Sequence, residues 1–434
     1  MSMEMKDSGV EWIGEIPEDW DLIRIQSQLH EVNEKNSPIK VQQILSLTNI
    51  RGVIPYKDKG NLGNRAKENL EDYKIAYPGT IVANSMNILI GSVGYCGYLG
   101  CVSPVYYVFA PAKAANIKFM NYFMSMTAFQ KELRRNANGI LEIRMRVTVA
   151  DILKKKMAIP SPTAQQQIVH FLDCKCTAID TAIEKTKKSI VKLEEYKKAV
   201  ITKAVTKGIN PNAKMKDSGV EWIGEIPEGW EVKKLKHAIT KFSKGNGITK
   251  DDVVESGDVS CVRYGEIYTQ YNYVFDKCKT RTNMENVSSP QTFSYGDILC
   301  AGTGELIDEI GRPIVYLGKE LCLAGGDIII IKHQQDPLFM SFVLNSAYCQ
   351  GQRSIGKYKL KVVHISAGDI GNIKIALPRL NDQIKIAQFL KEKNELIDGM
   401  IKAKINSIMK LEEYKKSLIY YAVTGKIDCR NEVI

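Results

Sequence analysis

The chain has 434 residues, and its 60 Lys or Arg against 49 Asp or Glu give a formal net charge of +11 at neutral pH, which favours a polyanionic partner such as nucleic acid. With 44% apolar residues it can bury several cores, and no apolar run is long enough to predict a membrane span. Early acidic residues at Glu4, Asp7 and Glu11 predict no signal peptide. The ten cysteines and five histidines have no metal-ligand spacing, so we expect a cytoplasmic protein with free thiols and no metal site.

The chain opens on a segment that occurs twice. Residues 5–20 read MKDSGVEWIGEIPEDW and residues 215–230 read MKDSGVEWIGEIPEGW, so fifteen of sixteen positions match. A second repeated block contains LEEYKK at Leu193 and again at Leu411, 218 residues later. The material between these blocks has diverged strongly. This order of variable and constant parts predicts a duplicated unit. Its two variable segments form two different functional domains, which we call heads, and its constant segments form a common scaffold that carries them.

The variable segments, residues 21–157 and 231–375, predict mixed α/β domains. Short β-rich runs alternate in them with Gly, Asn and Asp turns. The runs are residues 41–47, 79–84 and 105–110 in the first segment and residues 258–264, 296–302 and 327–332 in the second. A helical stretch follows each set, near residues 117–135 and 337–353.

The constant segments predict long helices. Seam positions recur in alternating steps of four and three from Leu172 to Ala204, and the second copy repeats this spacing from Leu390 to Ala422. Each helix should run about 40 residues, or roughly 60 Å. Because a helix of this length cannot bury its seam alone, we expect the two copies to pack against each other as an antiparallel coiled coil. The alternative is that each helix lies on its own domain.

The ends of the predicted helices carry their own signals. Thr163 followed by Gln166 has the spacing of a capping box at the start of the first helix. Gly208 and Gly425 are expected to end the two helices.

The predicted fold class is therefore α/β (α+β) heads in two copies, separated by two long α-helices packed as an antiparallel coiled coil, with a pseudo-twofold internal repeat. The predicted bounds are 1–157 for the first head, 158–212 for the first helical region, 213–375 for the second head and 376–434 for the second helical region.

The sequence predicts no catalytic residue. A DNA methyltransferase needs a glycine-rich cofactor loop and an Asn/Asp-Pro-Pro-aromatic motif. The nearest segments are residues 301–304 and 336–339. The second segment lacks the second proline of the motif, and its Asp336–Pro337 pair is better explained as a helix start. The chain has no P-loop. The E-x-K formed by Glu195 and Lys197 lies in a charged helix without a partner acidic motif.

Basic residues cluster near the end of each variable segment, at a density that suits phosphate contacts, although a solvated basic face is the alternative. The predicted phosphate contacts are Lys131, Arg134, Arg135, Arg144, Arg146, Arg353, Lys357, Lys359 and Lys361. Side chains able to read base edges lie beside predicted strand ends. The predicted base readers are Asn84, Ser85, Asn87, Arg263, Tyr264 and Thr303.

Two divergent heads alternating with two near-repeated long helices resemble the specificity subunit of type I restriction–modification systems. The resemblance is carried by the P-x-x-x-x-Q…FL segments at 160–172 and 378–390, the LEEYKK helices, the G-T-I-V and G-D-I-L strands, and the W-I-G-E-I-P-E-x-W openings at 12–20 and 222–230. It covers essentially the whole chain.

This resemblance implies that each head is a target recognition domain for one half of a bipartite DNA site, with the helices fixing the distance between the halves. It implies two DNA adenine methyltransferase subunits, which bind S-adenosylmethionine, and an ATP-dependent restriction subunit as partners, while this chain holds no cofactor. The outer helix faces are the expected docking surface for the methyltransferase. The residues proposed there are Glu194, Tyr196, Glu412 and Tyr414.

Three alternatives remain at this point. The specificity subunit of a type II-like (IIB/IIG-related) system has the same features and differs only in its partners. A stand-alone DNA methyltransferase predicts that the pure chain methylates DNA. A coiled-coil scaffold predicts no sequence-dependent DNA binding and leaves the diverged heads unexplained.

Overall fold

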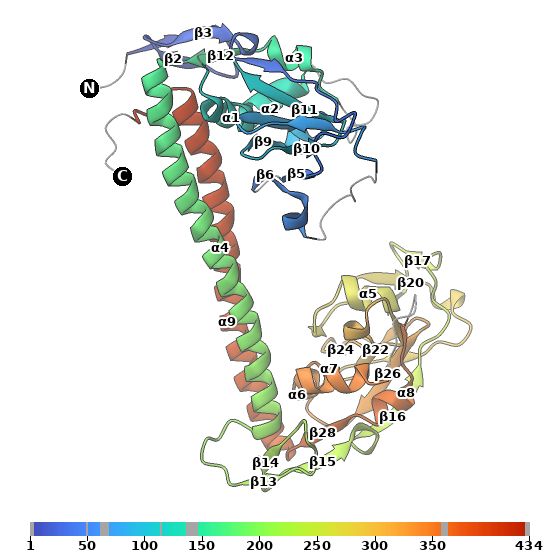
Figure 1. The fold of residues 1–434 in the computed structure, drawn as a ribbon. Coiled ribbons are helices and arrows are strands. Elements are labelled where there is room, and N and C mark those ends of the chain that lie inside the picture. The colour runs from blue at the N-terminus through green and yellow to red at the C-terminus, as the bar shows by residue number, and fades with distance from the viewer. Residues whose placement is uncertain are drawn as a thin grey trace. The chain divides into compact units, whose positions relative to one another are not determined.

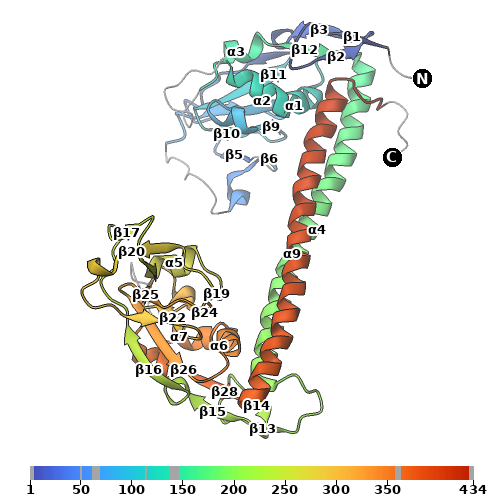
Figure 2. The same ribbon diagram turned by 180° about the vertical axis from the view of Figure 1, so that it is seen from behind.

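The computed structural model describes residues 4–48, 51–60, 69–112, 115–135, 146–356 and 363–429. The chain divides into two compact units, of which the first comprises residues Met1–Thr186 and Ile405–Ile434 and the second comprises Lys187–Lys404. Each unit contains one α/β head and a stretch of each long helix (Figures 1 and 2). Across the residues described, no helix combines the length and the apolar character needed to span a membrane.

The two long helices are α4 (Pro162–Lys207) and α9 (Leu380–Val423), which have 46 and 44 residues. They are slightly longer than predicted. Every position of the predicted seams is buried or half-buried, whereas most residues between them are exposed. In the first unit Leu172 near the start of α4 shares a core with Leu418 near the end of α9. The predicted seam is confirmed, and the helices pack together with opposite directions.

Two equivalent ion pairs join the long helices. In the first unit, Nζ of Lys415 lies 2.7 Å from a carboxylate oxygen of Asp180, and in the second unit Lys197 lies 2.7 Å from Asp398. Asp398 is the repeat of Asp180 and Lys415 is the repeat of Lys197, each 218 residues further on. Each type of contact thus occurs twice with the helices exchanged, as an antiparallel coiled coil with a pseudo-twofold internal repeat requires.

The start of α4 differs from the prediction by two residues. The hydroxyl oxygen of Ser161 accepts the backbone N–H of Ala164 at 3.3 Å, and Pro162 occupies the first helical position. The predicted capping box of Thr163 and Gln166 is therefore wrong, because both residues already lie inside the helix.

The repeated P-x-x-x-x-Q motif has a local structural cause. The buried side chain of Gln165 donates from Nε2 to the carbonyl oxygen of Pro160 at 3.0 Å, and Gln383 donates to Pro378 at 2.9 Å in the second copy. A carbonyl just before a helix has no partner within the helix, so this glutamine satisfies it. The motif thus ties the first turn of each long helix to the segment that precedes it.

The repeated opening segments pack against the ends of the long helices. Gly425, after α9, and Gly208, after α4, both have φ of +73°, as predicted for glycines that end helices. Pro17 and Trp20 of the first opening segment lie against Gly425, and Trp230 of the second lies against Gly208. The first segment of the chain is thereby held by its last helix.

Replacing Gly425 by alanine should destabilise the first unit more than the same change at Gly208 destabilises the second. Both changes strain a left-handed backbone by about 1–2 kcal/mol. A Cβ at Gly425 would also lie 2.4 Å from Cδ of Pro17, whereas at Gly208 the nearest atom, on Trp230, is 3.3 Å away. We expect an extra loss of about 1–3 kcal/mol at Gly425 in urea unfolding. Equal losses in the two variants would contradict this packing.

The head of the first unit is built on a four-stranded antiparallel sheet with the order β4-β11-β8-β9, and helices pack on one face. Its strands are β1 (Met5–Asp7), β2 (Glu15–Pro17), β3 (Asp21–Arg24), β4 (Leu29–Glu31), β5 (Leu45–Thr48), β6 (Gly52–Pro55), β7 (Lys74–Ala76), β8 (Thr80–Asn84), β9 (Val93–Cys96), β10 (Gly100–Val102), β11 (Tyr106–Pro111) and β12 (Lys156–Ile159). Its α-helices are α1 (Ile117–Ser125), α2 (Thr127–Arg134) and α3 (Val149–Leu153). The pairing of β12 with β3 closes the head just before α4 begins.

The head of the second unit has two five-stranded sheets, with the orders β16-β26-β22-β24-β19 and β17-β20-β18-β25-β21. Its strands are β13 (Met215–Asp217), β14 (Glu225–Pro227), β15 (Glu231–Lys234), β16 (Ile239–Lys244), β17 (Val253–Val254), β18 (Val259–Val262), β19 (Val274–Phe275), β20 (Thr280–Thr282), β21 (Thr292–Phe293), β22 (Ile298–Ala301), β23 (Thr303–Gly304), β24 (Pro313–Tyr316), β25 (Cys322–Ala324), β26 (Ile328–His333), β27 (Val363–His364) and β28 (Lys374–Leu377). Its α-helices are α5 (Tyr264–Thr269), α6 (Pro337–Leu344), α7 (Ala347–Ser354) and α8 (Ala367–Gly371).

The helical stretch predicted in each head is a pair of short helices, α1 with α2 and α6 with α7. Asp336 caps α6 by accepting the N–H of Phe339 at 2.7 Å, and Pro337 follows at the first helical position. This confirms the prediction that the Asp-Pro pair starts a helix.

The second head contains a half-buried histidine, His333, that should make this head acid-sensitive. Nδ1 of His333 accepts the N–H of Gln335 at 3.1 Å, and its Nε2 is buried without a partner among the described residues. Burial lowers the pKa of His333, although Asp297 acts in the opposite direction. The unfolded chain therefore takes up a proton near about pH 6.5 before the folded head does, and stability falls as the pH drops.

The variant His333→Asn keeps an acceptor near the position of Nδ1 but cannot titrate. We expect its unfolding free energy to decrease less than that of the unmodified chain between about pH 7 and 5. Urea unfolding followed at several pH values measures the difference. Identical pH profiles for the two proteins would show that His333 does not contribute.

Candidate nucleic-acid interface

In each head a central strand ends beside the end of the basic segment. β8 of the first head lies between β11 and β9, and β22 of the second lies between β26 and β24. After β8, the carbonyl oxygen of Ser85 accepts the N–H of Val147 at 3.2 Å. After β22, strand β23 pairs with β27 in antiparallel register. We call this shared surface the strand-end edge; it comprises residues 85–91 with 146–147 in the first head and residues 302–309 with 363–365 in the second.

Short helices support the strand-end edge in both heads. The 3-10 helices η3 (Asn87–Ile90) and η7 (Ile307–Glu309) pack against α2 and α7, respectively. In the second head the hydroxyl of Ser354 donates to the carbonyl oxygen of Ile307 at 3.3 Å. The hydroxyl of Tyr268 on α5 also donates to the carbonyl oxygen of Thr303 at 2.8 Å. The same frame thus presents different side chains in the two heads.

Four predicted contacts of the first head are exposed around this edge. Asn87 begins η3, Lys131 and Arg134 project from the neighbouring α2, and Arg146 lies beside Val147. The structure therefore brings together a candidate base reader and three candidate phosphate contacts. Their roles stay predictions.

Arg135 forms ion pairs within its own head. NH1 of this arginine lies 3.1 Å from a carboxylate oxygen of Glu11 and 3.4 Å from Glu132, so a phosphate would have to compete with both. The remaining predicted phosphate contacts at Arg144, Lys357, Lys359 and Lys361 lie outside the described residues.

Arg353 is a structural residue, and its predicted phosphate contact is wrong. Its side chain is buried, and the residue is only 6% exposed. Nε donates to the carbonyl oxygen of Ile310 at 3.1 Å, and NH1 donates to the carbonyl oxygen of Leu344 at 2.5 Å. Arg353 is the last residue but one of α7, the place that buried Leu133 takes in α2. It ties α7 to the end of α6 and to the segment that follows η7.

Two predicted base readers of the first head also lie in the interior. Asn84 is buried, and its Oδ1 accepts the backbone N–H groups of Met86 and Asn87 at 3.0 and 3.3 Å. Ser85 is buried beside it. Asn84 therefore shapes the turn that exposes Asn87. The predicted base contacts of Asn84 and Ser85 are wrong, because both side chains are buried.

In the second head, only Tyr264 of the three predicted base readers has a free and exposed side chain. Nε of Arg263 donates to Oε1 of the buried Glu266 at 2.9 Å. Thr303 is buried where β23 pairs with β27, so its predicted base contact is corrected as well. Sequence reasoning missed the exposed His364 on β27 and the exposed Leu306 beside η7. The only sequence signal for His364 was its position at the end of the basic segment.

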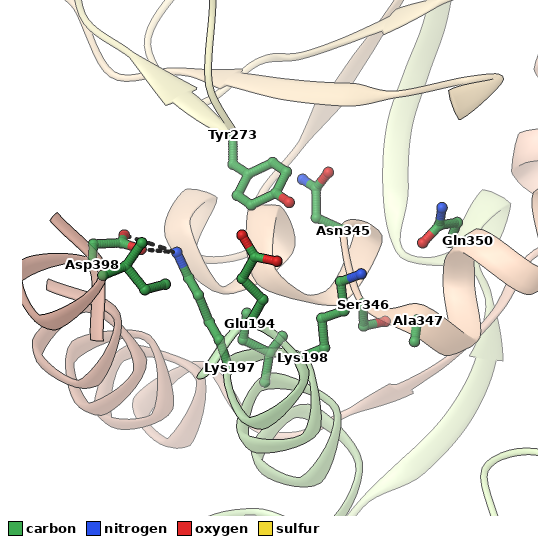
Figure 3. Close-up of a pocket in the computed structure, with 11 residues that line it drawn as sticks. Glu194, Lys197, Lys198, Tyr273, Asn345, Ser346, Ala347, Gln350 and Asp398 are labelled. Atoms are coloured by element: carbon green, nitrogen blue, oxygen red, sulfur yellow. Dashed lines mark hydrogen bonds and ion pairs between the residues drawn. The ribbon is translucent and has the colours of Figure 1, made fainter. Parts of the chain in front are cut away.

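The predicted docking residues on the long helices have two different environments, the open helix surface and the lining of a pocket. Tyr196 and Tyr414 are both 56% exposed, and Glu412 is also exposed. Glu194 instead lines a pocket of about 440 Å³ between α4 and the head of the second unit, where it points toward Tyr273 (Figure 3). Glu194 is exposed like the other three, and all four residues stay candidates for the docking surface.

Within the described residues, no group of three or more His, Cys, Asp or Glu side chains could hold a metal ion. Eight of the ten cysteines are buried, and no disulfide occurs among the described residues.

Comparisons with known proteins agree with this architecture. The family model of the type I restriction modification DNA specificity domain matches the chain twice, over residues 17–195 and 227–410. The MjaVIII specificity subunit of a type I restriction enzyme from Methanocaldococcus jannaschii is 24% identical over 434 residues, covering 96% of this chain and 95% of that protein.

Two solved structures share the fold. A chain from a structure titled "Structural basis underlying complex assembly and conformational transition of the type I R-M system" superposes with a TM-score of 0.72 at 13% identity, covering 95% of this chain and 99% of that one. The HsdS subunit from Thermoanaerobacter tengcongensis superposes with a TM-score of 0.55 at 14% identity, covering 95% and 98% of the respective chains.

The chain therefore belongs to the family of type I restriction modification DNA specificity domains, and it carries two of them. It is the DNA sequence-specificity subunit of a type I restriction–modification system, a subunit that recognises DNA and is itself not catalytic.

Proposed function

We propose that this chain recognises a bipartite double-stranded DNA site, one half with each head, and docks two DNA adenine methyltransferase subunits. An ATP-dependent restriction subunit joins this complex for cleavage. S-adenosylmethionine and ATP are then bound by those partners in the cytoplasm, and this chain holds neither. The heads comprise residues 1–157 and 213–375, and residues 158–212 and 376–434 form the helical regions.

The observation that carries this proposal is the strand-end edge. In both heads the same backbone contacts join this edge, while the exposed polar side chains differ: Asn87 and Arg146 in one, His364 in the other. A fixed frame with different polar side chains suits two surfaces that discriminate between different base sequences. The exposed Tyr196 and Tyr414 occupy repeat-related places on the two helices, which suits two copies of one docking protein.

The test is to map N6-methyladenine in DNA from cells that carry this chain with its cognate methyltransferase subunit. We expect a motif of two short specific parts separated by a gap of fixed length. Exchanging residues 1–157 for a different head should alter one part and leave the other part and the gap unchanged. A continuous motif, or a change in both parts, would contradict the proposal.

A further inference from the structure

The first tryptophan of each repeated segment has a different environment in the two units. In the first unit the ring of Trp12 lies 5.8 Å from those of Phe123 and Phe129, and the residue is half-buried. In the second unit Trp222, its repeat, is 51% exposed. Since the surrounding segments match at fifteen of sixteen positions, the cause must lie in what packs against them.

Two substitutions leave Trp222 uncovered. Phe129 is the third residue of α2, and the third residue of α7 is the smaller Cys349. On the long helices, Tyr420 of the first unit donates its hydroxyl to the carbonyl oxygen of Ile13 at 3.1 Å. Its repeat in the second unit is Thr202, whose hydroxyl oxygen is buried without a partner in the described structure.

The space beside Trp222 is a groove of about 480 Å³ that we call the Trp222 groove. Its lining includes Trp222, Thr202 and the exposed lysines Lys198, Lys203 and Lys207, and no acidic residue. Lys198 and Ala347 also line the pocket of Figure 3, so the two hollows adjoin. None of the strand-end edge residues contributes to either one.

The chemistry of this lining selects an acidic occupant with an apolar anchor. The three lysine ammonium groups, with no carboxylate among the residues that line the groove, attract acidic side chains. An exposed tryptophan beside a hollow binds a buried aromatic or aliphatic side chain, the usual centre of a protein interface. A nucleic-acid backbone would use the lysines but leave the apolar hollow unfilled.

We propose that the Trp222 groove receives an acidic segment of a docked methyltransferase subunit, with one aromatic or aliphatic side chain of that segment inserted beside Trp222. The identity of this partner rests on the proposed function. At the repeat-related place in the first unit Tyr420 closes the site, so only one of the two docking ends has this contact.

Three variants of the full chain test the proposal. Lys198→Glu reverses a charge in the groove, and Lys416→Glu reverses the repeat-related charge in the first unit, where we propose no groove. Thr202→Tyr introduces the side chain that closes the first unit. Each protein is titrated with the purified cognate methyltransferase subunit by calorimetry, and complexes are counted by native mass spectrometry.

We expect Lys198→Glu and Thr202→Tyr to weaken binding of one methyltransferase copy about tenfold, and Lys416→Glu to change it less than about twofold. Thr202→Tyr should also shift tryptophan emission to shorter wavelength, which reports that the folded groove has been filled. Equal effects of Lys198→Glu and Lys416→Glu would overturn the proposal.

Two further outcomes separate this proposal from the proposed function. If complexes form and both groove variants bind as tightly as the unmodified chain, the groove proposal fails and the proposed function stands. If the unmodified chain binds no methyltransferase subunit, both fail. A loss of DNA affinity in Lys198→Glu with unchanged methyltransferase binding would assign the groove to DNA and overturn the proposal.

Discussion

Replacing Arg353 by leucine should lower the free energy of unfolding of the second head by about 3–5 kcal/mol. The guanidinium group donates to the carbonyl oxygens of Ile310 and Leu344, and all three groups are inside the head. Leucine fills part of the volume, as Leu133 does in the first head, but leaves both carbonyl oxygens without this donor. A buried acceptor left unpaired loses about 1–3 kcal/mol, and a charged donor strengthens the original bonds.

Arg134→Leu is the matched control, because Arg134 is exposed on α2 of the first head. We expect it to change stability by less than about 0.5 kcal/mol. Urea unfolding of both variants, followed by circular dichroism, measures the two effects. A loss below about 1 kcal/mol for Arg353→Leu would mean that the two carbonyl oxygens find other partners, and would contradict the structural role.

Arg146→Ala and Asn87→Ala should affect DNA recognition in different ways, although the two residues belong to the same strand-end edge. Arg146 is a predicted phosphate contact, so its loss should weaken binding to all sequences alike and reduce the salt dependence by about one phosphate contact. Asn87 is a predicted base reader, so its loss should relax the preference at one base pair by about 1–3 kcal/mol.

The measurement is binding of the assembled complex to a library of half-site variants at several salt concentrations. Changes at the strand-end edge of the first head should leave the half-site of the second head unaltered. Lys185→Ala, an exposed change on α4, is the control and should alter neither affinity nor preference. A uniform loss of affinity from Asn87→Ala would reassign that residue to the phosphate contacts.

The regular elements followed from the sequence because their patterns are local. The run at 79–84 became β8 (Thr80–Asn84), and the run at 327–332 became β26 (Ile328–His333). Gly79, with φ of +83°, marks the turn before β8, and the apolar residues that follow are buried. The helix seam was equally predictable, since a spacing of four and three leaves few other arrangements for a long helix.

The candidate interface was less predictable because polar residues serve two purposes. Asn84 and Asn87 are three residues apart and chemically alike, yet Asn84 turns inward to hold the loop and Asn87 turns outward. Arg353 belongs to a basic cluster in the sequence but takes a place that the first head gives to leucine. Only the packing of α7 against its neighbours separates these cases. The i, i+4 spacing of Cys349 and Arg353 on a buried helix face was the one available warning.

The packing of the first opening segment on the end of α9 affects the order in which the chain can fold during synthesis. The second unit, Lys187–Lys404, is complete before the last thirty residues are made. The first unit needs Tyr420 and Lys426 to bind Ile13, so the head that leaves the ribosome first finishes folding last. A premature stop codon that removes Tyr420 and the residues after it would therefore damage the N-terminal head and leave the other head intact.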